Sequence, residues 1–196
     1  IGSQSNDGGG TDAGHVRVYQ YASSSWSQLG GDIDGEAASD KSGKSISLSD
    51  DGTILAVGAY YNDGGGTNAG HVRVYKYASG SWSQLGGDID GEAANDFSGW
   101  SVSLSDDGTI LAVGAYRNDG GGTDAGHVRV YKYASSSWGQ LGGDIDGEAA
   151  GDWSGFAVSL SGDGTKLAVG AHNNDGGGAD AGHVRLYKYA SSSWAQ

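Results

Sequence analysis

The chain has 196 residues, with 24 acidic and 11 basic side chains and a formal net charge of −13. This charge disfavours binding to nucleic acid or to an anionic membrane surface. The absence of cysteine excludes disulfides and thiolate chemistry, and no apolar run approaches the ~20 residues that would span a bilayer.

A repeat organises the chain. His15, His71, His127 and His183 recur at intervals of 56 residues, and each opens a copy of the phrase GHVRVYKY or a close variant of it. Such a period is typical of arrays of one unit that cannot bury its apolar face alone. We therefore predict one repeat array over residues 1–196, with about 3.5 units. The predicted units are a partial one at 1–43, then 44–99, 100–155 and 156–196, the last with an incomplete final strand.

Each unit predicts four strands, which the third unit illustrates. They are residues 100–105 (WSVSLS), 110–115 (ILAVGA), 127–133 (HVRVYKY) and a run from 138 towards 145. The first strand alternates apolar and polar residues, and the second is apolar on both faces, as in a strand buried between layers. Asp107-Gly108 predicts a tight hairpin between them, and Gly142-Gly143 predicts a bulge in the fourth strand.

Four antiparallel strands with short connections form the blade of a β-propeller. No segment of the chain shows the apolar spacing of a helix. The sequence therefore predicts an all-β fold, a β-propeller built from four-stranded blades of 56 residues, with a parallel β-solenoid as the alternative.

The run SGWSVSLSDDGTILAVGAYRNDGGGTDAGHVRVYKY resembles the FG-GAP repeats of integrin α-chain-type propellers. An aromatic-glycine start, Val-Gly-Ala after the second strand and Gly-x-Val-x-Val-Tyr in the third strand carry this resemblance. It implies a secreted or cell-surface propeller that serves adhesion or glycan binding, often with bound calcium. The family's calcium loop between the first two strands is reduced here to short hairpins such as Ser49–Thr53, which also resemble those of WD-repeat blades. Too few oxygen ligands remain there for calcium.

A second acidic motif offers possible calcium ligands. Asp88-Ile89-Asp90-Gly91-Glu92 and its copies place carboxylates two residues apart around a glycine turn, which can converge on a hard cation. Asx-turns would explain the same loops without a metal. Calcium is the one cofactor that the sequence suggests, and the candidate metal ligands are Asp32, Asp34, Glu36, Asp88, Asp90, Glu92, Asp144, Asp146 and Glu148.

The repeats differ most on the face that carries the long loops between the second and third strands. Loops on a rigid scaffold often bind ligands, although neutral drift at exposed positions gives the same variation. The candidate ligand-binding residues are Tyr60, Tyr61, Tyr116, Arg117, His172 and Asn173. For the nearby Phe97, Trp100, Trp153 and Phe156, we expect packing between neighbouring blades rather than contact with a ligand.

A catalytic centre is not apparent. The four recurrent histidines have no cysteine or second histidine beside them, so we interpret them as hydrogen-bonded residues at the start of a strand. No G-x-S-x-G motif is present, and a near-identical array offers no asymmetric constellation. We therefore expect that the protein is not an enzyme.

Two functional classes remain open. The first is an extracellular binding or adhesion propeller that presents repeated acidic loops to a glycan or protein ligand. The second is a structural protein that assembles by pairing of blade edges. Because 3.5 units cannot close a ring alone, we expect self-association or membership of a longer repeat chain, with no nucleic-acid partner and no membrane span.

Overall fold

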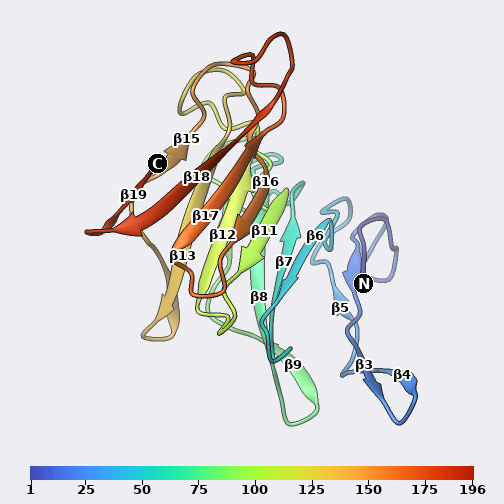
Figure 1. The fold of residues 1–196 in the computed structure, drawn as a ribbon. Helices are drawn as coiled ribbons and strands as arrows, with labels where there is room; N and C mark the ends of the chain where they lie inside the picture. The colour runs from blue at the N-terminus through green and yellow to red at the C-terminus, as the bar shows by residue number, and fades with distance from the viewer.

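The computed structural model describes all of residues 1–196, which form nineteen strands and no helix. It therefore contains no helix that could cross a membrane. The strands form sheets that follow one another in chain order as an open row, with the N-terminal unit at one end and the C-terminal sheet at the other (Figure 1). Each sheet thus has a neighbour from the adjacent repeat.

Three sheets repeat one antiparallel order. The second sheet contains β6 (Ser45–Leu48), β7 (Ile54–Ala59), β8 (His71–Ala78), β9 (Ser81–Gln84) and β10 (Ile89–Asp90). The third contains β11 (Ser101–Leu104), β12 (Ile110–Ala115), β13 (His127–Ala134), β14 (Ser137–Gln140) and β15 (Ile145–Asp146). The C-terminal sheet contains β16 (Ser154–Leu160), β17 (Lys166–Ala171), β18 (His183–Ala190) and β19 (Ser193–Ala195).

The N-terminal unit consists of two small sheets. One joins β1 (Gly2–Ser3), β2 (His15–Val16) and β5 (Ile33–Asp34), and the other is the hairpin of β3 (Tyr19–Ala22) and β4 (Ser25–Gln28). All strand pairs in the molecule's sheets are antiparallel, so the β-solenoid alternative is wrong. The all-β repeat architecture is confirmed, whereas a closed propeller and its number of blades stay predictions.

The predicted Asp-Gly hairpins form as expected. In the turn between β11 and β12, Gly108 has a φ of +68°, which a glycine adopts without a steric penalty. Asp107 Oδ1 accepts hydrogen bonds from the Ser105 hydroxyl at 2.7 Å and from the Thr109 backbone N–H at 2.9 Å. The carboxylate of Asp107 is therefore engaged in hydrogen bonds within the turn itself.

The fourth strand of each repeat is interrupted rather than continuous. Both β14 and β15 pair with β13, with Tyr131 opposite Gln140 and Val128 opposite Ile145. The pairing register changes between these two segments, where Gly142 has a φ of +84°. The predicted strand from 138 to 145 is thus two short strands around the predicted bulge.

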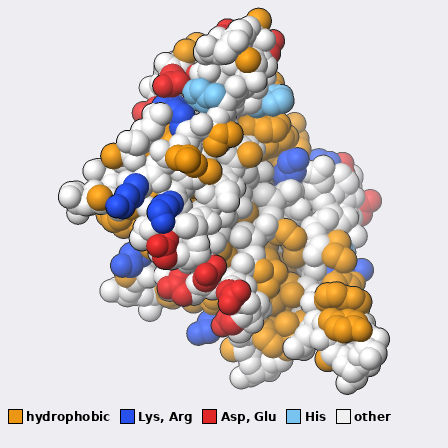
Figure 2. Space-filling view, viewed as in Figure 1, with side chains coloured by type: hydrophobic (Ala, Val, Ile, Leu, Met, Phe, Trp, Pro, Cys, Tyr) orange, Lys and Arg blue, Asp and Glu red, His pale blue; other side chains and the backbone are white.

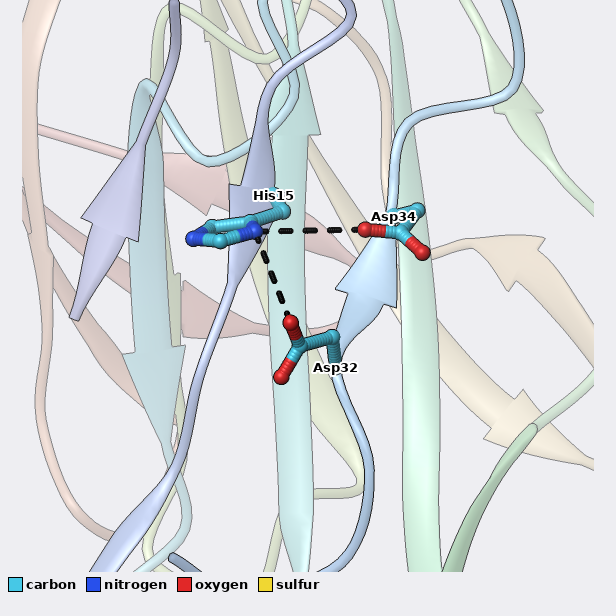
Figure 3. A group of neighbouring side chains, drawn as sticks. All are labelled: His15, Asp32 and Asp34. Carbon is cyan, nitrogen blue, oxygen red and sulfur yellow. Dashed lines mark ion pairs between the residues drawn. The ribbon is translucent and has the colours of Figure 1, made fainter. Parts of the chain in front are cut away.

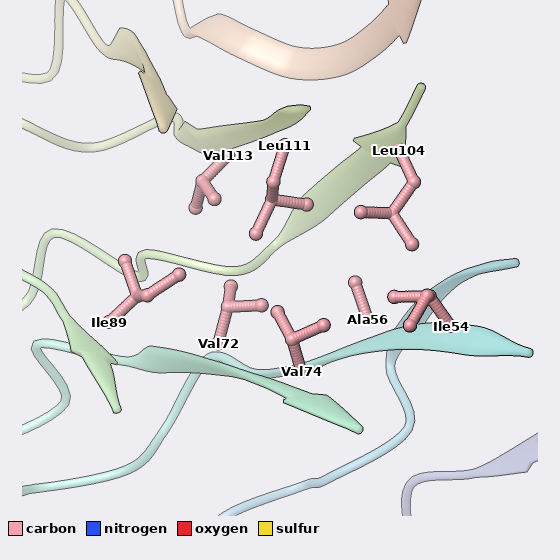
Figure 4. Packing of buried hydrophobic residues seen from close by; sticks show 8 residues of the cluster. All are labelled: Ile54, Ala56, Val72, Val74, Ile89, Leu104, Leu111 and Val113. Atoms are coloured by element: carbon pink, nitrogen blue, oxygen red, sulfur yellow. The ribbon is translucent and has the colours of Figure 1, made fainter. Parts of the chain in front are cut away.

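The hydrophobic core lies between successive sheets. Leu104, Leu111 and Val113 of the third sheet pack against apolar residues of the second sheet (Figure 4). The facing residues are Ile54, Ala56, Val72, Val74 and Ile89. Equivalent clusters join the third sheet to the C-terminal sheet and the N-terminal unit to the second sheet. A sheet therefore buries its apolar residues only when the adjacent repeat is present.

Hydrogen bonds between repeats fix the alignment of the sheets. The indole N–H groups of Trp82, Trp138 and Trp194 each donate at 2.8 Å to a leucine carbonyl of the preceding repeat. The Ser45 hydroxyl donates at 2.7 Å to the carbonyl of Gly99, which directly precedes the first strand of the third sheet. The same carbonyl lies where a Cβ on Gly58 would stand, so close approach requires glycine in Val-Gly-Ala.

Candidate functional site: histidine–carboxylate clusters and an aromatic rim

Each recurrent histidine is the first residue of its strand and faces nearby carboxylates. In the N-terminal unit, His15 Nδ1 lies 3.8 Å from Asp32 Oδ2 and 3.9 Å from Asp34 Oδ1 (Figure 3). Antiparallel pairing of β2 with β5 places Asp34 directly opposite His15. The strand register thus brings together residues that are far apart in the sequence.

The second cluster spans two repeats. His71 Nδ1 lies 3.8 Å from Glu36 Oε2, contributed by the N-terminal unit, and 3.9 Å from Asp90 Oδ1 of its own sheet. Arg73 forms an ion pair with Glu36, and its Nε donates to Asp88 Oδ1 at 2.9 Å. An imidazole, a guanidinium and three carboxylates therefore meet where adjacent repeats join.

The third and fourth clusters repeat this arrangement in part. His127 Nδ1 lies 3.9 Å from Glu92 Oε2, and Arg129 pairs with Glu92 and Asp144. At the C-terminal sheet, His183 faces Glu148 of the preceding repeat at 3.8 Å. His127 Nδ1 is buried and has no hydrogen-bond partner. The histidines thus start strands as predicted, but the predicted hydrogen bond is absent at His127 Nδ1 and at His183 Nε2.

Burial controls the protonation of the internal histidines. Desolvation lowers the pKa of His71 and of His127 below the usual value for an imidazole, which favours the neutral ring at neutral pH. Hydrogen bonds from Arg129 and Gln140 lower the pKa of Asp144. The third cluster therefore combines a neutral imidazole with an ionised carboxylate and a guanidinium.

The structure places eight of the nine predicted metal ligands beside a histidine. These are Asp32, Asp34, Glu36, Asp88, Asp90, Glu92, Asp144 and Glu148. Asp146 pairs with His127 through the backbone, and its side chain makes no ion pair. Sequence reasoning missed the histidines and arginines of these clusters, although the pairing of the third strand with the Ile-Asp segment could have indicated them. Calcium binding by the carboxylates stays a prediction.

Five of the six predicted ligand-binding residues join one group of aromatic side chains and an adjoining arginine, which we call the aromatic rim. It consists of Tyr60, Tyr61, Phe97, Trp100, Tyr116, Arg117, Trp153, Phe156 and His172. Asn173, the sixth, is not part of this group, and its backbone N–H donates to the Asp152 carbonyl at 3.1 Å.

Ring contacts link the rim across three sheets. Trp100 lies 5.0 Å from Tyr60, 4.7 Å from Tyr116 and 5.4 Å from Phe156, measured between ring centroids. Phe156 in turn stacks on His172 at 4.8 Å. As expected, Trp100 and Phe156 pack between neighbouring repeats, and the rim also has exposed parts because the His172 side chain is open to solvent.

Cations and a hollow adjoin the aromatic rim. Lys44 Nζ lies 4.1 Å above the Trp100 ring, and the Arg117 guanidinium lies 5.3 Å from the Phe97 ring. A hollow of about 370 Å³ beside the rim is lined partly by Phe156, His172 and Val184. Flat rings, positive charge and an accessible hollow are a combination that suits a ligand with both apolar and polar surfaces.

Backbone strain recurs at one position of the rim. Phe97 has a φ of +57° and Trp153 a φ of +55°, and the equivalent Lys41 has a φ of +58°. A left-handed conformation costs a bulky residue about 1–2 kcal/mol. Because the same conformation appears in three repeats with different side chains, the repeat geometry imposes it and the aromatic residues are presented from a strained turn.

Antiparallel sheets that pack face to face at a fixed period define an all-β tandem-repeat protein. Residues 33–75, 89–131 and 145–187 each match the profile of the FG-GAP repeat. These segments cover more than half of the chain, which therefore belongs to the FG-GAP repeat family. Among curated proteins, no sequence matches the chain.

Several solved structures share the fold at low sequence identity. A protein of Bacteroides uniformis, provisionally described as a 6-phosphogluconolactonase, is 12% identical with a TM-score of 0.64, over 99% of this chain and 52% of that one. The periplasmic gluconolactonase of Pseudomonas aeruginosa is 20% identical with a TM-score of 0.57, over 89% and 46%. The hydrazine synthase of Kuenenia stuttgartiensis is 15% identical with a TM-score of 0.53, over 85% and 38%. The chain thus spans about half or less of these proteins.

These similarities correct one expectation. The near-identical repeats led us to expect that the protein is not an enzyme, yet the solved structures that share this fold include proteins described as lactonases. The exclusion is therefore wrong, because a fold of this kind can hold an active site within a regular array. At these identities the likeness concerns the fold alone and assigns no activity to this chain.

Proposed function

We propose that this FG-GAP repeat chain is a binding or adhesion module that acts outside the cytoplasm and holds a glycan at the aromatic rim. The gathering of the variable residues Tyr60, Tyr116 and His172 around Trp100 and Phe156 carries this proposal. Sugar rings have apolar C–H faces that pack on flat aromatic rings, while their hydroxyls need polar partners at the edge.

The charges of the chain narrow the class of glycan. The net charge of −13 repels a polyanionic ligand at long range. Lys44 and Arg117 nevertheless place positive charge beside the rings of the rim. We therefore expect a neutral glycan, or one with a few carboxylates close to the stacked sugar.

The proposed location rests on the family and on one similar structure. FG-GAP repeats are typical of extracellular proteins, and a structure of the same fold is described as periplasmic. Fractionation of the source cells tests this part of the proposal, and recovery of the protein only from the cytoplasm would contradict it.

A glycan array tests the binding site. We expect signals from the wild-type chain that fall at least about tenfold in Trp100→Ala, since the rim loses its central ring. Tyr21→Ala is the matched control, because Tyr21 is an exposed aromatic residue of the N-terminal hairpin, away from the rim. Equal binding by wild type and Trp100→Ala would contradict a glycan site here, and binding of proteins alone would favour a protein ligand.

Self-assembly is a second candidate function, favoured by the exposed apolar surface at the N-terminal end. Apolar side chains gather over the β3–β4 hairpin (Figure 2), and a groove of about 510 Å³ there is lined only by hydrophobic residues, among them Ile1, Trp26 and Leu48. A second copy or a further repeat could cover this surface.

Light scattering of the purified chain in calcium and in chelator tests assembly. We expect the wild-type chain to have a solution mass of more than one chain. This mass should fall in Trp26→Asp, because a charge in the apolar groove opposes burial of the groove. A monomer at all concentrations would contradict self-assembly through this end. Dissociation only in chelator would assign the contact to calcium.

A further inference from the structure

We propose that the histidine–carboxylate clusters between adjacent repeats bind a divalent cation of the zinc class, with imidazole as a ligand. The site is separate from the aromatic rim, and the inference does not depend on glycan binding. In the cluster around His71, the ligands are His71 at the start of a third strand, Glu36 from the preceding repeat and Asp90 of the Ile-Asp segment.

The cluster around His71 has the clearest geometry. Two carboxylate oxygens, one from Glu36 and one from Asp90, lie 3.8 and 3.9 Å from the same atom, His71 Nδ1. Bonds of about 2.0–2.2 Å to zinc place two ligands of a tetrahedral site about 3.4 Å apart. Each of the two distances from His71 Nδ1 exceeds this value by about half an ångström or less, so binding one ion at this nitrogen requires small shifts of the two carboxylates, with water as a further ligand.

The equivalent His127 shows that the imidazole nitrogen lacks a partner. His127 is only 4% exposed, and its Nδ1 has no hydrogen bond although it faces Glu92 Oε2 at 3.9 Å. A buried nitrogen without a partner destabilises the folded state, because it has lost its hydrogen bond to water. A cation between this nitrogen and the carboxylate would remove that destabilisation.

The arginine of each cluster occupies some carboxylate oxygens and leaves others available. Arg73 pairs with Glu36 Oε1 and with Asp88, whereas Glu36 Oε2 faces His71. Asp90 forms no ion pair with an arginine. Arg73 therefore acts as a positioning residue that orients Glu36, in the manner of partners that orient metal ligands. The three carboxylates and one guanidinium leave a charge of −2, which matches a divalent cation.

The donor set favours the zinc class over calcium. Calcium takes 6–8 oxygen ligands, whereas the His71 cluster offers one nitrogen and two free carboxylate groups. Imidazole with carboxylate suits zinc and its transition-metal neighbours. Histidine and carboxylate atoms also gather at two other positions, His15 with Asp32 and Asp34, and His127 with Glu92 and Asp144, where Asp144 is paired with Arg129.

Binding at these positions would join neighbouring sheets. Glu36 comes from the N-terminal unit, whereas His71 belongs to the second sheet. A cation that ligates both stabilises the docked arrangement over separated repeats, since the separated repeats offer no complete site. Cation binding and thermal stability therefore test the same contact.

The experiment is a calorimetric titration of the chelator-treated chain of residues 1–196 with zinc chloride, followed by measurement of bound metal. We expect saturable binding and a higher thermal midpoint with zinc, whereas calcium at the same concentration produces neither. We expect the double variant His71→Gln, His127→Gln to lose about two equivalents of zinc. Glu36→Gln should weaken one site about tenfold while the circular dichroism spectrum is unchanged.

The matched control is Asp50→Asn, which removes an exposed carboxylate of the β6–β7 hairpin and should leave zinc binding unchanged. Wild-type zinc binding by a folded double variant would overturn the proposal. Loss of binding in His172→Gln alone would also overturn it, because it would assign the zinc to an exposed histidine. Calcium binding that depends on Glu36 but not on His71 would contradict the proposal that the cation is of the zinc class.

Discussion

The interface between the second and third sheets differs sharply from the N-terminal end, although the same residues recur in both. Leu104 is 7% exposed between the sheets, whereas the equivalent Leu48 is 42% exposed beside the N-terminal unit. Trp138 donates its indole N–H to Leu85, whereas Trp26 is 69% exposed. Burial in this protein is therefore a property of the neighbouring repeat rather than of the residue.

The polar clusters follow the same rule. His71 and His127 receive a glutamate from the preceding repeat, whereas His15 has only aspartates of its own unit around it. The internal clusters also contain an arginine bonded to carboxylates of two repeats. An internal histidine thus depends on its neighbour for charge as well as for packing.

The largest expected difference between the two regions is in the loss of stability when a leucine is replaced by alanine. Leu104→Ala should lower the free energy of unfolding by about 2–5 kcal/mol, because it opens a cavity in the packed core between the sheets. Leu48→Ala should cost less than about 1 kcal/mol, since much of its surface is already hydrated. Denaturant titration measures both. Equal losses would mean that the N-terminal end is covered in solution.

A smaller difference is expected from the indole hydrogen bonds. Trp138→Phe should cost about 1–3 kcal/mol, because the Leu85 carbonyl loses its donor and the larger ring is trimmed. Trp26→Phe should leave stability within about 0.5 kcal/mol of wild type. Thermal unfolding of the two variants measures this contrast. A large effect of Trp26→Phe would indicate that its indole is engaged in an assembly.

The smallest expected effect is a dependence of stability on pH. The folded pKa values of His71 and His127 lie below the unfolded value of about 6.5, so the unfolded chain binds protons that the folded chain does not. Stability should therefore fall as the pH decreases from about 6.5 towards the folded pKa values. Thermal midpoints between pH 7 and pH 5, in chelator, measure this fall.

The double variant His71→Gln, His127→Gln sharpens this pH test. It should show a shallower fall over the same interval, because the two groups that take up protons on unfolding are gone. A slope that is unchanged in the double variant would assign the pH dependence to other groups.

Much of the fold could be predicted from the sequence, since its determinants are local. Alternating residues in the first strand, the apolar ILAVGA run and the Asp107-Gly108 turn each act within one unit. Gly142-Gly143 also signalled the interruption between β14 and β15. Part of the aromatic rim could also be predicted from the sequence, because its residues differ between repeats at matching positions.

The histidine clusters could not be derived in the same way. Glu36 and His71 belong to different repeats and meet only when the sheets dock. A periodic sequence shows each residue type at its position in the unit, but it does not show which residue of the neighbouring unit it contacts. Carboxylates were therefore assigned to calcium without the imidazole and guanidinium groups that share their site.

The indole bonds that align the sheets have a consequence for how this protein can change over time. Every one of them links residues 53 positions apart, and the serine bonds to glycine carbonyls link residues 54 positions apart. Recombination between the near-identical repeats adds or deletes whole units and leaves all of these offsets intact. The length of the array can therefore evolve without redesign of any single contact, whereas an insertion within a unit would break the alignment of its neighbours.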